Sequence, residues 1–204
     1  MEGWAGTMKE LVIASKNHGK IREIEQAFAG LPVKVMALSA FGDIPDAIED
    51  GSTFQENACI KAEFYGKLTG KACLADDSGL EVAALEGQPG VYSARYAGEN
   101  ATDADNNAKL LHELKAKQCS NAMARFRCAL VFRDCDGTIL TCEGSCEGTI
   151  LSEPRGADGF GYDPLFFVTS LQKSMAEISL IEKNKISHRG IALSKMAKQL
   201  AGYL

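Results

Sequence analysis

Residues 73–82, CLADDSGLEV, begin as an apolar strand and then place two carboxylates side by side, Asp76 and Asp77, before a serine and a glycine. We expect KACLA (71–75) to form a buried strand that delivers both acids at its carboxyl end. Ligands of α/β sheets bind outside the carboxyl ends of strands, so the two acids form a candidate metal site. Asp-Ser-Gly is also ordinary turn chemistry, so either acid could simply cap a turn.

Strands and helices are expected to alternate around this segment. Apolar periodicity predicts strands at 10–15 and 33–38, helices that end at Gly30 and near Leu68, and helices at 106–117 and 188–204. Helix starts with capping-box spacing are expected at Thr53 with Glu56, Thr102 with Asp105, and Ser179 with Glu182. Residues 125–150 predict a hairpin around Asp136-Gly137. The chain is therefore expected to be a single α/β domain over 1–204 whose mixed sheet carries a long antiparallel ribbon, with 1–8 as a disordered extension.

Composition excludes several classes of protein. A chain of 204 residues with 46% hydrophobic residues is long enough for one sizeable core. A net charge of −5 without a Lys/Arg block argues against nucleic acid as a partner. No apolar run reaches the roughly 18–20 residues of a membrane span, and the first residues lack a signal-peptide pattern, so we expect a cytoplasmic protein with no membrane partner. The seven cysteines include no CxxC pair, which favours free, buried thiols over a zinc site.

A second candidate site lies in SKNHGK (15–20), which follows the first expected strand. Gly19 belongs to a short loop, and Lys20 falls in the first turn of the expected helix. A cation at that position opposes the helix dipole unless an anion is bound there, which favours a phosphate site. The spacing is not that of the phosphate loop of nucleoside triphosphatases, and a surface lysine at a helix start is common.

Six motifs in order across residues 11–193 carry a resemblance to a known family. They are SKNHGK, TFQENACIKA (53–62), ADDSGLEV (75–82), PGVYSARYAG (89–98), GFGYDPLF (159–166) and EKNKISHRGIAL (182–193). Together they resemble the inosine/xanthosine triphosphate pyrophosphatases, the Ham1-like enzymes that remove deaminated purine nucleotides. The resemblance implies a mixed twisted sheet flanked by helices, with a nucleotide cleft between two lobes, an architecture shared with anticodon-nuclease-like folds.

The resemblance also implies an activity. It is the Mg²⁺-dependent hydrolysis of ITP, dITP and XTP between the α and β phosphorus, giving the monophosphate and pyrophosphate, by a homodimer. Asp77 would bind the metal and act as base toward water, and Lys61 would be a further catalytic and phosphate-binding group. The remaining residues implied for the phosphate end of the substrate are Ser15, Lys16, Asn17, His18, Gly19, Lys20 and Ser78.

The second metal carboxylate has several candidates. The family's acidic pattern before Gly-x-Thr-Phe indicates Glu49, with Glu56 as the second choice and Asp76 as outer-sphere support. Ile48 stands where many relatives carry another acid, but Mg²⁺ keeps several waters and needs only one or two protein carboxylates. The alternative interpretation of DAIEDG (46–51) is a solvated loop.

The other end of the substrate is assigned to two late motifs. The resemblance implies a purine pocket in which an aromatic ring stacks on the base and donors meet its oxo group, formed by Phe160, Gly161, Tyr162, Asp163, Lys183, His188 and Arg189. Taken singly, the aromatic residues could instead pack in the core beside a tight turn. His188 and Arg189 could likewise be a helix start exposed to water.

Two rival functions remain at this point. A Maf-like nucleotide pyrophosphatase would have a related architecture, but its first loop resembles Ser-x-Ser-Pro-Arg-Arg rather than SKNHGK. A nucleotide-binding sensor without turnover could share the pocket, yet it has no need for an acid beside the α-phosphate.

Overall fold

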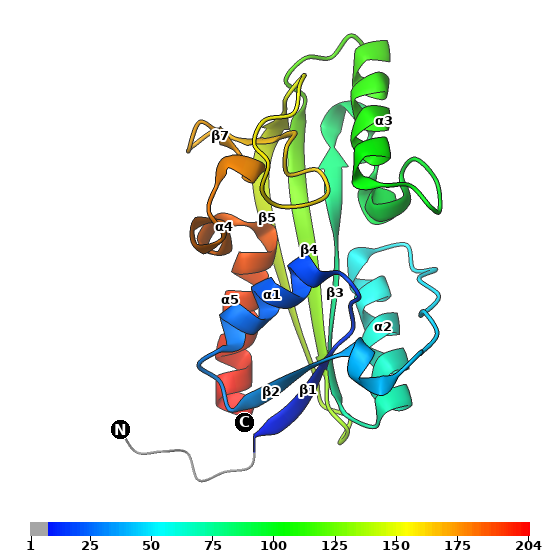
Figure 1. Ribbon diagram of the computed structural model, residues 1–204, viewed down its shortest axis with the longest axis vertical. Coiled ribbons are helices and arrows are strands. Elements are labelled where there is room, and N and C mark those ends of the chain that lie inside the picture. Colours follow the sequence, from blue (N-terminus) through cyan, green and yellow to red (C-terminus); the bar gives the residue numbers. More distant parts are fainter. Residues whose placement is uncertain (1–7) are drawn as a thin grey trace. The chain divides into compact units, whose positions relative to one another are not determined.

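A computed structural model describes residues 8–204 and contains a seven-stranded sheet in the order β2-β1-β3-β4-β5-β6-β7 (Figure 1). The strands are β1 (Lys9–Ile13), β2 (Val33–Ala37), β3 (Ala72–Val82), β4 (Met123–Arg133), β5 (Ile139–Ile150), β6 (Phe166–Val168) and β7 (Lys173–Ser174). The α-helices are α1 (His18–Phe28), α2 (Phe54–Thr69), α3 (Asp103–Ala116), α4 (Leu180–Ile186) and α5 (His188–Tyr203). This confirms the expected mixed α/β sheet flanked by helices. Of the expected extension over 1–8, only Met8 lies within the described residues, and it is exposed.

The chain divides into two compact units. Unit 1 comprises the chain up to Asp77 together with Ala129–Glu143 and Gly190–Leu204, and unit 2 comprises Ser78–Cys128 and Gly144–Arg189. Strands β3, β4 and β5 each contribute residues to both units. The peptide bond between Asp77 and Ser78 is one of the points where the chain passes from unit 1 to unit 2. The expected nucleotide cleft between two lobes stays a prediction.

The structure corrects the expected length of the acidic strand. β1 pairs in parallel with β2 and with β3, and its register with β3 runs from Leu11 opposite Ala72 to Ile13 opposite Leu74. The Ala14 amide still donates to the Leu74 carbonyl at 2.9 Å, after which β1 leaves the sheet. β3 continues to Val82 because β4 lies on its other side. The two acids therefore lie in the middle of β3, just beyond the end of its pairing with β1.

The longest antiparallel elements, β4 and β5, run through both units. β4 and β5 are neighbours joined by only residues 134–138, a connection too short for a parallel crossover, so they form the predicted hairpin. β5 continues the antiparallel pairing to β6, and β6 to β7, two short strands. One core cluster of unit 2 brings together Leu80, Val82, Leu110, Leu114, Phe126, Ile150 and Phe166.

Two of the three predicted capping boxes are complete. Thr102 with Asp105 opens α3, and Ser179 with Glu182 opens α4, each with both reciprocal hydrogen bonds. The box at α2 is only half formed. Thr53 accepts from the Glu56 amide, but the Glu56 carboxylate accepts from the Ser52 amide and hydroxyl, both at 2.7 Å. The expected reciprocal bond to Thr53 is replaced because Ser52 offers that carboxylate two donors.

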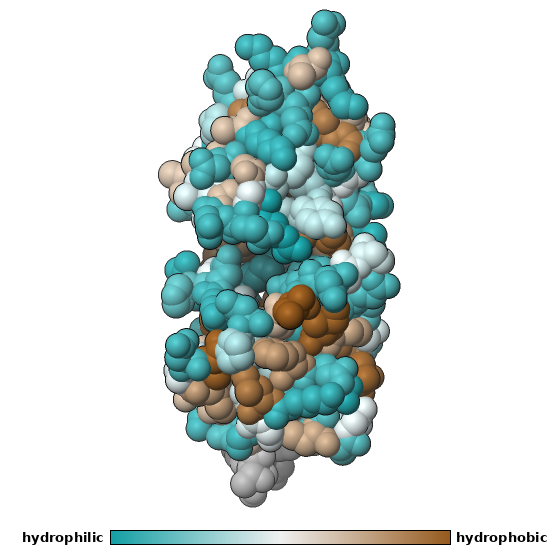
Figure 2. Space-filling model, turned by 90° about the vertical axis from the view of Figure 1, so that its right-hand side faces the viewer, coloured by the Kyte–Doolittle hydropathy of each residue, from teal (hydrophilic) through white to brown (hydrophobic). Residues whose placement is uncertain are grey.

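One face of the molecule is mainly hydrophilic. Figure 2 shows mostly hydrophilic residues with limited hydrophobic patches on the face that it presents. Among residues 8–204, no helix combines the length and the apolar character needed to cross a bilayer. The seven cysteines are free thiols, but Cys59 and Cys135 are exposed, which corrects the expectation of burial for these two.

A buried carboxylate in unit 1 joins three distant segments. Asp134, at the end of β4, accepts hydrogen bonds from the Lys9 ammonium, from the Tyr203 hydroxyl at 2.5 Å and from the Cys135 amide at 2.7 Å. Burial pushes the pKa of Asp134 upward, but the bonds from Lys9 and Tyr203 outweigh it and the pKa lies below its ordinary value. The first strand, the hairpin turn and the last helix are thereby tied together.

Asp134→Asn should lower the free energy of unfolding by about 1–3 kcal/mol, because charge-assisted bonds from Lys9 and Tyr203 are lost. Since folding lowers this pKa, the contribution is complete above about pH 4 and is lost as the pH falls through the lower folded-state pKa. Denaturant titrations at neutral and acidic pH would measure the difference. Asp136→Asn, at the exposed neighbouring carboxylate, is the control and should cost much less; equal losses would contradict the assignment.

Candidate active site

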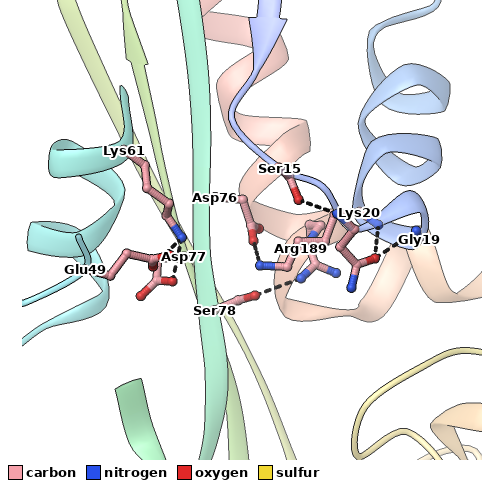
Figure 3. A network of polar contacts seen from close by, with 10 residues as sticks. Ser15, Gly19, Lys20, Glu49, Lys61, Asp76, Asp77, Ser78 and Arg189 are labelled. Atoms are coloured by element: carbon pink, nitrogen blue, oxygen red, sulfur yellow. Dashed lines mark hydrogen bonds and ion pairs between the residues drawn. The ribbon is translucent and has the colours of Figure 1, made fainter. Parts of the chain in front are cut away.

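Alternation along β3 separates the two adjacent acids. Successive side chains of a strand point to opposite faces of the sheet. Asp76 forms an ion pair with Lys20 of α1, whereas Asp77 contacts Lys61 of α2 at 2.8 Å (Figure 3). Figure 1 shows α1 and α2 on opposite sides of the unit 1 strands. The two carboxylates therefore serve two different lysines on two faces and do not act as one pair.

Lys61 joins Asp77 to a second carboxylate. Its ammonium lies 2.8 Å from Asp77 Oδ1 and 2.7 Å from Glu49 Oε2 (Figure 3). Burial alone would lower the pKa of Lys61, but the charges of Asp77 and Glu49 outweigh this and the pKa is raised. Burial raises the pKa of Asp77, an effect that Lys61 and Lys20 partly offset. Asp77 is thus a stronger base than an exposed carboxylate.

The loop that carries Glu49 is anchored to α2 on both sides of that residue. The Ala47 amide donates to the Tyr65 hydroxyl at 3.3 Å, and the Gly51 amide donates to Asn57 Oδ1 at 2.8 Å. A β-carbon on Gly51 would lie 2.7 Å from Asn57 Oδ1, so this approach requires glycine. Since Lys61 is one turn beyond Asn57, one helix fixes both ends of the contact between Glu49 and Lys61.

The donor set fits a magnesium ion. Asp77 Oδ2 is buried and has no hydrogen-bond partner among residues 8–204. Asp77 and Glu49 converge on one cation, the Lys61 ammonium. No cage of three or more His, Cys, Asp or Glu side chains occurs in the described part of the chain, but Mg²⁺ needs only one or two carboxylates. Of the alternatives, Glu56 is engaged by Ser52 and Asp76 pairs with Lys20.

The other face of β3 meets the start of α1. Asn17 caps this helix, its Oδ1 accepting from the Gly19 amide at 2.8 Å and the Lys20 amide at 3.1 Å. Ser15 accepts from the Asn17 amide at 3.1 Å. Asp76 is fully buried and holds Lys20, whose own side chain stays partly accessible. The predicted phosphate loop is therefore a capped helix start with a fixed lysine beside it.

The remaining residues of this loop face solvent. His18 is exposed, and Lys16 forms an exposed ion pair of 2.7 Å with Asp46, a residue that the sequence did not single out. Exposed pairs of this kind contribute little to stability. Lys16 can therefore exchange Asp46 for an anionic ligand at low cost.

Arg189 organises the predicted base site in unit 2. It is buried, and its Nη2 donates to Ser78 Oγ at 2.8 Å (Figure 3). Its guanidinium carbon lies 5.5 Å from the centroid of the Phe160 ring, and Lys183 Nζ lies 4.8 Å from the same centroid. Two cations and an aromatic ring are thus gathered in one unit.

The backbone of the Phe160 loop is held by Asp163. Its Oδ2 accepts from the Phe160 amide at 3.0 Å and from the Lys183 ammonium at 2.7 Å. Gly159 has φ +84°, and a β-carbon there would lie 2.2 Å from Asp163 Oδ2. A buried ion pair thus shapes the loop in which Phe160 stands, and Asp163 supports the site through the backbone.

Two predicted pocket residues lie in packed surroundings. Tyr162 belongs to the unit 2 core and its hydroxyl donates to the Ser93 carbonyl at 2.9 Å. The His188 ring stacks on Phe126, with centroids 4.7 Å apart and planes inclined by 15°. Tyr162 therefore packs in the core, as the alternative interpretation of this residue predicted. His188 is buried at the start of α5, so the alternative of a helix start exposed to water is wrong for this residue. Their contact with a base stays a prediction.

Some residues that shape the site gave no local signal. Tyr65 and Phe126 act through Ala47 and His188, which are distant in the chain, so sequence spacing could not assign them. Asn57 accepts from Gly51, only six residues before it, but the bond depends on how the Glu49 loop folds back onto α2. Alternation along β3 could have separated Asp76 from Asp77, had the strand been extended past the acids.

A family model, curated relatives and solved structures all match this chain over nearly its whole length. The model of the Ham1 family matches residues 11–199. A dITP/XTP pyrophosphatase of Geobacter sulfurreducens is 50% identical over 95% of this chain and 97% of its own, and one of Bacillus licheniformis is 51% identical over 95% and 98%. The solved structure of a HAM1 protein from Coxiella burnetii matches with a TM-score of 0.87 and 46% identity over 96% of this chain and 100% of its own. The chain belongs to the Ham1 family.

Proposed function

We propose that this protein hydrolyses deaminated purine nucleoside triphosphates, dITP, ITP and XTP, to the monophosphate and pyrophosphate. The observation that carries the proposal is the buried Asp77, which Lys61 holds through one oxygen while the other oxygen has no hydrogen-bond partner among the described residues. Relatives about 50% identical over nearly the whole chain are named dITP/XTP pyrophosphatases, which supports the same substrate class here.

Unit 1 supplies the groups that suit a polyphosphate. Lys20 is fixed by Asp76 beside the amino-terminal end of α1, and an anion is favoured at a helix start. Lys16 and Lys61 add two further ammonium groups that are already paired with carboxylates. These groups can bind the triphosphate whatever base it carries.

Asp77 is the group best suited to act on water. A general base works best when its pKa lies near the operating pH, and burial raises the pKa of Asp77 in that direction. In our proposal Asp77 orients a water toward the α-phosphorus and accepts its proton. The bond from the α-phosphorus to the bridging oxygen breaks, and pyrophosphate leaves.

A magnesium ion would be held by Asp77 and Glu49. When bound it would polarise phosphoryl oxygens and offset their charge. Lys61, which now contacts both carboxylates, would then be available to the phosphates. The requirement for Mg²⁺ is part of the proposal, as are the homodimer and the cytoplasmic location implied by the family resemblance.

Unit 2 supplies the groups that suit the base. Phe160 offers a ring for stacking, and Lys183 and Arg189 lie beside it as donors. Deaminated purines present a 6-oxo acceptor where adenine presents an amino donor, so donors here would favour them over ATP. The adjacency of Asp77 and Ser78 in the chain connects the two sets of groups covalently.

Phosphorus NMR of the products tests the reaction. Incubation of ITP with the protein and Mg²⁺ should give inosine monophosphate and pyrophosphate, and a chelator should abolish the turnover. Release of inorganic phosphate would contradict cleavage between the α and β phosphorus. Binding of ITP without turnover would favour the nucleotide sensor, and a preference for canonical nucleotides would favour a Maf-like enzyme.

Asp77→Asn should lower turnover of ITP by about 10²–10⁴-fold, because the amide cannot accept the proton of the attacking water. Binding of the nucleotide should fall much less, since Lys20 and Lys61 remain. Steady-state kinetics and calorimetry with a non-hydrolysable α,β-methylene analogue of ITP measure the two effects separately. Near-normal turnover at saturating Mg²⁺ would leave Asp77 with a structural role only.

Arg189→Met should reduce catalytic efficiency on ITP by about 10–10²-fold, in line with the loss of a charge-assisted hydrogen bond, while efficiency on ATP changes little. Methionine keeps much of the side-chain volume at this buried position. Lys20→Ala is the matched comparison, and it should weaken ITP and ATP by a similar factor because its ammonium meets phosphate. Equal losses on ITP and ATP for the arginine variant would assign Arg189 to the phosphates.

A further inference from the structure

The first two turns of α3 hold both backbone polar groups of one residue in the Phe160 loop. The Gly161 amide donates to Asp103 Oδ2 at 2.7 Å, and the Gly161 carbonyl accepts from Asn107 Nδ2 at 2.9 Å. Asp103 and Asn107 are four residues apart on one helix, so they lie on the same face. One acceptor and one donor thus match the amide and the carbonyl of Gly161.

We propose that Asp103 and Asn107 are positioning residues. By holding the backbone of Gly161 they fix the Phe160 ring, and the ring in turn determines where the nucleobase binds. This inference rests on the proposed function, because it gives the Phe160 ring the task of stacking on a purine. Neither residue belongs to the motifs that carry the family resemblance, and neither contacts Phe160 through its own side chain in the bonds described. Asp103 and Asn107 act on the Phe160 ring through the backbone of Gly161, the next residue in the chain.

The conformation of the loop explains why such a clamp is needed. Phe160 stands between Gly159 and Gly161, which have φ +84° and +62°. Glycine adopts many backbone conformations, so a loop with two of them does not fix a side chain by itself. Asp163 holds the loop at the Phe160 amide, and the α3 pair holds it at Gly161. Phe160 is therefore fixed from both sides.

The clamp takes no part in the capping bonds of α3. Thr102 and Asp105 form the complete capping box of this helix, and Asn106 bonds to the Ala97 amide and the Ala94 carbonyl. Asp103 is exposed and belongs to neither arrangement. Removal of its carboxylate should therefore leave α3 folded while it releases Gly161.

Substitutions at the two positions test the inference. Asp103→Ala and Asn107→Ala should each raise KM for ITP by about 3–30-fold with a much smaller change in kcat, the range expected for one lost hydrogen bond. Asp103→Asn keeps an acceptor and should restore most of the affinity. Asn107→Asp should be worse than Asn107→Ala, because it sets a carboxylate against the Gly161 carbonyl. Glu99→Ala removes an exposed carboxylate shortly before α3 and is the matched control.

Calorimetry with two probes separates positioning from general damage. The α,β-methylene analogue of ITP should bind the Asp103→Ala variant more weakly, while inorganic triphosphate, which lacks a base, should bind as it does to the unmodified protein. A double-mutant cycle with Phe160→Ala adds a second readout. Because Asp103 acts through that ring, its loss should cost little more once the ring is gone.

Each outcome bears on one proposal. Additive losses in the cycle, or equal weakening of both probes, would overturn the positioning role. Unchanged binding of the ITP analogue to both the Asp103→Ala and the Asn107→Ala variant would also overturn the positioning role. An unmodified protein that binds the analogue but does not turn over ITP would overturn the proposed function, while the comparison of the two probes would still decide the role of Asp103 and Asn107.

Discussion

The burial of two adjacent carboxylates in β3 is the constraint around which unit 1 is arranged. A charge removed from water is costly unless a counter-charge meets it. Because Asp76 and Asp77 point to opposite faces of the sheet, each requires a lysine from a different helix. α1 supplies Lys20 to Asp76, and α2 supplies Lys61 to Asp77 and anchors the loop whose Glu49 also contacts Lys61.

In unit 2 the corresponding constraint is the position of the Phe160 ring, which stands on a loop between two glycines. The buried pair of Asp163 and Lys183 holds one side of the loop, and the first turn of α3 holds the other. Such a ring is available to a flat ligand without prior ordering of the loop, and a preordered site loses less entropy on binding.

The charges of the two units also explain how an acidic protein can suit an acidic ligand. The chain carries a net charge of −5, yet Lys20, Lys61 and Lys183 are each held by a carboxylate in the described structure. Each pairing fixes the position of the ammonium group. In the proposed function a polyphosphate would meet Lys20 and Lys61 already in position, so that local arrangement would outweigh the overall charge.

Local patterns were enough to predict the capping boxes of α3 and α4, the β4–β5 hairpin and the six motifs, because each depends on residues close together in the chain. They were not enough to show that β3 continues past its acids, since that requires hydrogen bonds to β4, some fifty residues later. The partners of Asp76, Asp77 and Gly161 were likewise unpredictable. Each lies on another element, and only the packing of helices against the sheet determines which side chain reaches which face.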